Sequence, residues 1–195
     1  MAILIKEDLE QALVDGRIHF TGSIRKDSLL LTLGEQIQYF NEKPRIIDPF
    51  SIDSINELYG ETISNWGYTN LKPNQIVLIS SAEFVKLDRH HHAFISTLSH
   101  IARLGLMSHA SSSYVDPFFE GYLTLEIKNL TPHTFILRQG MPIAKLIIIE
   151  NTCPNSTKTE HRATYKKYYG SADSLRSKFA HEFSLPTKGD NDEHL

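Results

Sequence analysis

The alternation of apolar and polar residues is clearest near the middle of the chain, in residues 122–128. Apolar Leu123, Leu125 and Ile127 alternate there with polar Thr124, Glu126 and Lys128. A period of two residues is typical of a β-strand with one buried face. The pattern therefore predicts a strand that presents a carboxylate, Glu126, on its second face.

Further strands are predicted on both sides of this segment. Residues 28–40 form one or two strands with a break near Gly34, and residues 74–87 follow a turn at Lys72-Pro73. Residues 134–150 form two strands separated by a turn at Gln139-Gly140. Many short strands with frequent turn signals indicate a mainly β fold, a distorted β-barrel or jelly-roll-like sandwich with short helices at its margins.

Three helices are predicted from apolar spacing and capping residues. The first covers Lys6 to Val14, the second is a short helix within residues 51–60 capped by Ser51 or Asp53, and the third lies near Asp173 to Phe183. The polar residues 185–195 are expected to be disordered. The chain is thus expected to form one β domain in residues 1–170, followed by a C-terminal helix or lid and a tail in residues 171–195.

Composition narrows the classes of function. The 195 residues suffice for one domain with a core, and the formal net charge of −3 lacks the basic excess of nucleic-acid or anionic-membrane binders. A single cysteine, Cys153, excludes a disulfide framework and any cysteine-based metal cluster within the chain. No apolar run approaches the roughly 20 residues of a membrane span. We expect a cytoplasmic protein.

Individual polar residues leave the chemistry open. Three adjacent histidines, His90–His92, could bind a metal, but neighbouring strand residues face opposite ways, so a surface strand or turn is favoured. P-loop, Rossmann, zinc-deaminase and serine-hydrolase motifs are absent from the sequence. Considered alone, His109 is more typical of a structural histidine, and Glu126 is equally compatible with a solvated strand face and a functional carboxylate.

A longer motif gives a more specific signal. Residues 98–129 read LSHIARLGLMSHASSSYVDPFFEGYLTLEIKN. This stretch resembles, without gaps, the dCTP deaminase family pattern R-S-S-L-A-R-L-G-L followed by H-x-T-A-x-x-I-D-P-G-W-x-G-x-I-x-L-E-x-x-N. LRQGMPIAKL in residues 137–146 resembles the family's L-R-P-G-M-x-I-x-x-L, and weaker matches extend the resemblance to most of residues 5–150. The resemblance implies a dUTPase-like barrel that forms a homotrimer with sites between subunits.

The resemblance also implies an activity, the hydrolytic deamination of dCTP to dUTP at cytosine C4 without zinc. Water is a poor nucleophile at neutral pH, so a general base must take its proton as it attacks. By resemblance Glu126 is that base, Arg103 is a fixed cation that positions the site, and Ser99 hydrogen-bonds the water or the departing ammonia.

Substrate-binding positions follow in the same way. The family binds cytosine on a hairpin that corresponds here to residues 111–116, with Asp116 under the deoxyribose. The positions implied to bind substrate are His100, His109, Ser111, Ser112, Tyr114, Asp116, Lys167 and Tyr168. Mg²⁺ is expected only as an ion carried by the nucleotide triphosphate, with no dedicated protein metal site.

Several departures from the pattern keep alternatives in view. Leu98 and Tyr114 stand where the family has arginines, His100 replaces a serine, and Phe118 replaces the glycine after Asp-Pro. The lid glutamine is also missing after Lys167 and Tyr168. The phosphate-binding part of the site is therefore altered. A non-catalytic or regulatory nucleotide-binding trimer and a bifunctional deaminase and dUTP diphosphatase are the alternatives to a deaminase that releases dUTP.

Overall fold

The computed structural model describes residues 2–43, 46–151, 175–177 and 180, and it is built mainly from β-strands. Its strands and helices are, in chain order, β1 (Ala2–Ile3), α1 (Lys6–Val14), β2 (Ile18–Phe20), β3 (Ile24–Arg25), β4 (Ser28–Phe40), α2 (Ile52–Leu58), β5 (Tyr59–Ser64), β6 (Tyr68–Leu71), β7 (Ile76–Leu87), β8 (His91–Thr97), α3 (Ser99–Arg103), β9 (Leu106–Met107), β10 (Tyr114–Val115), β11 (Glu120–Asn129), β12 (Phe135–Arg138) and β13 (Pro142–Glu150).

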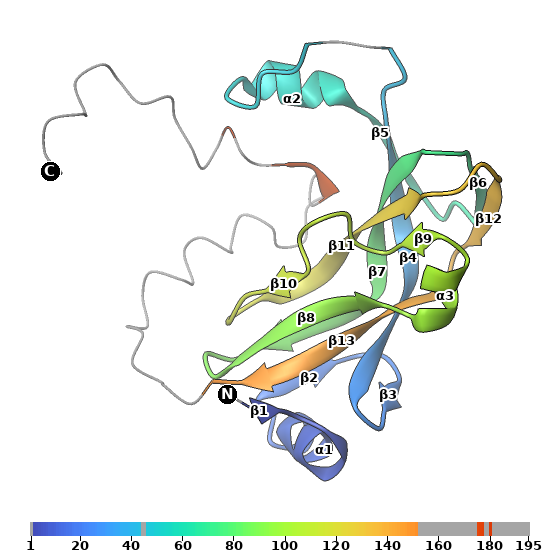
Figure 1. Cartoon of the computed structure of the whole chain (residues 1–195). Coiled ribbons are helices and arrows are strands. Elements are labelled where there is room, and N and C mark those ends of the chain that lie inside the picture. Colours follow the sequence, from blue (N-terminus) through green and yellow to red (C-terminus); the bar gives the residue numbers. More distant parts are fainter. Residues whose placement is uncertain (1, 44–45, 152–174, 178–179, 181–195) are drawn as a thin grey trace, which may run out of the picture.

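The strands pair antiparallel into one curled sheet that runs in the order β10-β8-β13-β4-β7-β11-β9 (Figure 1). Off this path, β1 pairs with β13, β2 with β7, and β3 and β5 with β4, and β6 and β12 form a separate two-stranded sheet. The predicted mainly β barrel with marginal helices is therefore confirmed. No helix in the part of the chain that the structure describes is long and apolar enough to cross a membrane.

The expected break at Gly34 is a change of partner within one continuous strand. Before it, β4 pairs with β13, and Leu33 already pairs with Ser81 of β7. Beyond it, the strand pairs with β5, and its register with β7 shifts between Leu33 and Ile37. A side chain at Gly34 would collide with the backbone carbonyls of Ser80, 2.7 Å away, and of Ser81. Only glycine lets the two parts of the sheet approach this closely.

The core lies inside the curl of the sheet. Leu31, Leu146 and Leu125, from three different strands, have no exposed side-chain surface. The predicted inner face of β11 is also confirmed, because all three of its apolar side chains are buried in this core. Burial of such side chains is the main force that stabilises the barrel.

The helices cover the margins of the sheet. α1 has the bounds predicted from sequence and buries Leu9 and Ala12. α2 begins after Ser51, whose hydroxyl accepts a hydrogen bond from the Ser54 amide at 3.3 Å, so Ser51 is the capping residue. The third predicted helix lies mostly outside the described residues, and the polar tail lies entirely outside them. Of the described residues in this helix, Leu175–Ser177 are not α-helical and Ala180 is.

The expectation of a surface position for His90–His92 is wrong for two of the three residues. His90 lies in the turn before β8, whereas His91 and His92 are buried at the start of that strand. β8 is an interior strand, paired with β13 on one side and β10 on the other. His91 Nδ1 donates a hydrogen bond to the Asp88 carboxylate at 2.6 Å, which satisfies one of the two ring nitrogens, while Nε2 is buried without a partner among the described residues.

Candidate active site

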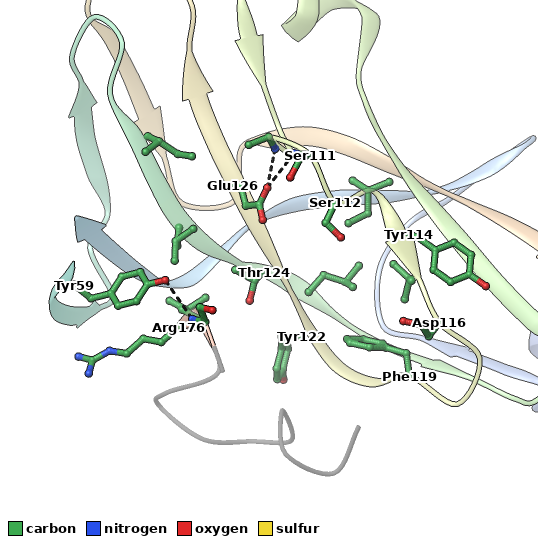
Figure 2. A pocket seen from close by; sticks show the side chains of 18 of the residues that line it. Tyr59, Ser111, Ser112, Tyr114, Asp116, Phe119, Tyr122, Thr124, Glu126 and Arg176 are labelled. Carbon is green, nitrogen blue, oxygen red and sulfur yellow. Dashed lines mark hydrogen bonds between the residues drawn. The ribbon is translucent and has the colours of Figure 1, made fainter. Parts of the chain in front are cut away.

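A cavity of about 690 Å³ opens beside the outer face of β11 (Figure 2). Tyr122, Thr124 and Glu126, which alternate along this strand, form part of its lining. The loop of residues 110–116 lines one side, and the ends of β4, β5 and β7 line another. The sequence alone did not decide whether this strand face is simply solvent-exposed or functional. The structure shows that it lines a cavity.

Glu126 ties the strand to the loop that leads into β10. Its Oε2 accepts a hydrogen bond from the backbone amide of Ala110 at 2.8 Å and a longer one from Ser111 at 3.4 Å (Figure 2). Its Oε1 accepts no hydrogen bond from the residues that the structure describes. The carboxylate is thus held by one oxygen, and the other is available to a water molecule or a ligand.

Four of the residues predicted to bind substrate lie in the lining of the same cavity, namely Ser111, Ser112, Tyr114 and Asp116. Burial raises the pKa of the Tyr114 hydroxyl above its ordinary value, and the negative charge of Asp116 raises that pKa further. Tyr114 is therefore a neutral hydrogen-bonding group at physiological pH. It cannot supply the positive charge of the arginine that it replaces.

The cavity also has an apolar end that the sequence did not reveal. Phe40, Tyr59 and Leu78 line it, together with Leu175 from the C-terminal part of the chain. The rings of Phe40 and Tyr59 lie 5.3 Å apart, and Leu175 is 3% exposed. These residues come from separate elements with no shared local pattern, so only the folded chain brings them together.

Other predicted residues lie away from this cavity. Ser99, His100 and Arg103 lie on α3, where all three are exposed, and none of them lines the cavity within one chain. α3 follows β8 and contacts β9, which pairs with the end of β11 at Lys128 and Asn129 (Figure 1). His109 is half-buried just before the loop and does not line the cavity.

The remaining predictions concern the lid and metals. Lys167 and Tyr168 lie outside the described residues. Among the residues that the structure does describe, no three histidine, cysteine, aspartate or glutamate side chains come together in a way that could hold a metal ion. The cavity therefore offers carboxylates, hydroxyls and backbone amides as its reactive and binding groups.

Comparison with known proteins adds independent evidence. The family model for dCTP deaminase-like proteins matches residues 3–151. A protein of Methanosphaera stadtmanae named "dCTP deaminase, dUMP-forming" is 30% identical over 197 residues, which cover 97% of this chain and 100% of that protein. A dCTP deaminase of Pyrobaculum aerophilum is 28% identical over 86% of this chain and 90% of its own length.

A solved structure shares the fold. The 2'-deoxycytidine 5'-triphosphate deaminase of Agrobacterium tumefaciens superimposes with a TM-score of 0.57 at 18% identity. The match covers 75% of this chain and 46% of the Agrobacterium chain, less than half of its length. The family model spans the barrel, the loop before β10 and the strand that carries Glu126. The chain therefore belongs to the dCTP deaminase-like family.

Proposed function

We propose that this protein hydrolyses the exocyclic amino group of dCTP, with Glu126 as the general base. One observation carries the proposal. Glu126 lies in a cavity beside the loop of residues 110–116, fixed through one carboxylate oxygen by two backbone amides, while the other oxygen accepts no hydrogen bond from the described residues. The names of the matched relatives support the same reaction and substrate.

The proposed mechanism uses the available oxygen. Glu126 Oε1 takes a proton from a water molecule as the water oxygen attacks C4 of cytosine, and a tetrahedral intermediate forms. The protonated carboxyl group delivers this proton to N3 of the ring, then takes the proton of the new C4 hydroxyl group and passes it to the amino nitrogen, so that the C4–N bond breaks, ammonia leaves and a C4 carbonyl remains. The backbone amides of Ala110 and Ser111 keep the carboxylate oriented through both transfers.

The proposed reaction can release either dUTP or dUMP as its product. Several relatives, including those of Methanosphaera stadtmanae and Methanobrevibacter smithii, are named as dUMP-forming. Asp116 lies in the same cavity as Glu126, where it can serve as the base for a second water that attacks a phosphate. We therefore favour release of dUMP and pyrophosphate over the release of dUTP that the sequence motif implied.

A shared site accounts for the residues that lie elsewhere. Ser99 and Arg103 are exposed on α3 and do not line the cavity of their own chain. We propose that α3 of a neighbouring subunit brings them to Glu126 in a homotrimer, and that Mg²⁺ enters with the triphosphate. We also propose that the protein acts in the cytoplasm, where its nucleotide substrate is found.

Glu126→Gln tests the base directly. The amide keeps an acceptor for the Ala110 amide but cannot take a proton, so deamination of dCTP should fall by about 10²- to 10⁴-fold. Glu120→Gln is the matched control, because Glu120 lies on the same strand, pairs with Lys86 at 3.0 Å and does not line the cavity. Unchanged ammonia release in Glu126→Gln would refute the assignment.

Product analysis tests the second step. Chromatography of the wild-type reaction with dCTP and Mg²⁺ should show dUMP, and Asp116→Asn should shift the product toward dUTP while ammonia release continues. A wild-type product of dUTP alone would rule out the bifunctional reaction. Tight binding of dCTP without any turnover would instead identify the regulatory nucleotide-binding protein.

A further inference from the structure

A second, smaller apolar cluster lies beside the cavity and contains part of the C-terminal segment. Its buried members are Ile55 of α2, Tyr59 of β5, Leu78 of β7 and Leu175. Phe40, Leu58 and Ala180 pack around them. Leu175 is separated from Tyr59 by more than a hundred residues of chain, so this cluster is a tertiary docking site for the segment Leu175–Ser177.

Polar contacts fix the same segment to one tyrosine and its neighbour. The backbone amide of Ser177 donates a hydrogen bond to the Tyr59 hydroxyl at 3.2 Å (Figure 2). The Arg176 guanidinium lies 6.0 Å from the centre of the Tyr59 ring, and its Nη2 donates to the Gly60 carbonyl at 3.4 Å. A ring contact, two hydrogen bonds and an apolar anchor therefore converge on the start of β5.

We infer that α2 and the start of β5 form a socket, centred on Tyr59, that holds Leu175–Ser177 in place as a wall of the nucleotide cavity. The inference rests on the proposed function for the identity of the nucleotide. Tyr59 acts as a positioning residue, since it lines the cavity and also holds the segment that lines it.

The orientation of the segment Leu175–Ser177 indicates that it lines the cavity and does not block it. Leu175 is directed into the cluster of Ile55, Tyr59 and Leu78, at the apolar end of the cavity. The Arg176 side chain extends away from Glu126, toward the far side of Tyr59 (Figure 2). The segment Leu175–Ser177 therefore does not cover the polar end, with Glu126 and the loop of residues 110–116.

Point variants of the full-length protein test this inference. Arg176→Ala and Tyr59→Phe each remove one polar contact of the socket and keep the apolar cluster. Each should raise the KM for dCTP about five-fold, the equivalent of about 1 kcal/mol, and should change kcat by less than about two-fold. Arg176→Lys, which keeps a cation over the ring, should restore part of the loss.

The chain offers a matched control. Arg138 lies over the ring of Tyr68 at 5.9 Å on the β6–β12 sheet, outside the cavity. Arg138→Ala therefore removes a similar contact and should leave KM unchanged.

Amide hydrogen exchange of residues 175–177 gives a second readout that does not need turnover. Exchange should become faster in Arg176→Ala and Tyr59→Phe, and it should stay as in the wild type in Arg138→Ala. Unchanged exchange in the first two variants would refute the socket. Faster exchange with an unchanged KM would refute the wall, and a lower KM would show that the segment blocks the cavity.

The two proposals can fail separately. If the wild-type protein does not deaminate dCTP, the proposed reaction is wrong. The wall is then tested by the dissociation constant for dCTP, measured by calorimetry, in place of KM. Weaker dCTP binding in the socket variants would still support the wall, whereas equal binding in all variants would overturn it.

Discussion

The two faces of β11 differ in what they contribute to the protein. On the inner face Leu123, Leu125 and Ile127 pack in the core of the barrel. On the outer face Thr124 and Glu126 line the cavity. Leu123 also borders the cavity, whereas Leu125 and Ile127 do not. Substitutions at Leu125 or Ile127 should therefore mainly lower stability, and substitutions at Thr124 or Glu126 should mainly affect the cavity.

The largest expected effect is on the inner face. Leu125→Ala leaves a cavity at a fully buried site, so the free energy of unfolding should fall by about 2–5 kcal/mol. Urea denaturation followed by circular dichroism measures this loss. Glu126→Gln, one residue away, should change the unfolding free energy far less. Similar losses in the two variants would contradict the division between the faces.

A smaller effect is expected at the end of the same inner face. The Asn129 amide nitrogen donates to the carbonyls of Leu71 at 3.2 Å, Lys72 at 3.0 Å and His133 at 2.6 Å. Asn129 is fully buried, and Asn129→Ala removes the donor that these three carbonyls share, so the variant should cost about 1–3 kcal/mol in the same denaturation experiment. A loss as large as that of Leu125→Ala would mean that the polar end of the face matters as much as its apolar centre.

The smallest effect is expected on the outer face beyond the cavity. Lys128 shares that face with Glu126, but it contacts the backbone of Asn74 and does not line the cavity. Lys128→Ala should change the unfolding free energy by no more than about 0.5 kcal/mol and should leave deamination unchanged. Reduced ammonia release in this variant would extend the functional face past Glu126.

Local patterns predicted the parts of the molecule that depend on neighbouring residues. The period of two in residues 122–128 predicted which side chains of β11 are buried, and apolar spacing predicted α1 with its observed bounds. The motif also led to Ser111, Ser112, Tyr114, Asp116 and Glu126, which the fold brings to one cavity.

Contacts between distant segments could not be predicted in this way. Phe40, Tyr59 and Leu175 form the apolar end of the cavity without any shared spacing in the sequence. The surface position predicted for His91 and His92 was wrong for a related reason. Polar residues at the start of β8 give no indication that this strand pairs with other strands on both sides. The hydrogen bond between His91 and Asp88 likewise forms only in the folded turn.

The position of β13 between β4 and β8 constrains how the chain can fold during its synthesis. Its residues 142–150 emerge from the ribosome more than forty residues after the last residue of β8, yet they pair with both strands. Until then β4 and β8 each expose an unpaired edge, which is the kind of surface that associates with other chains. The nascent protein is therefore expected to depend on chaperones until β13 closes the sheet, and its folding should be slow for its size.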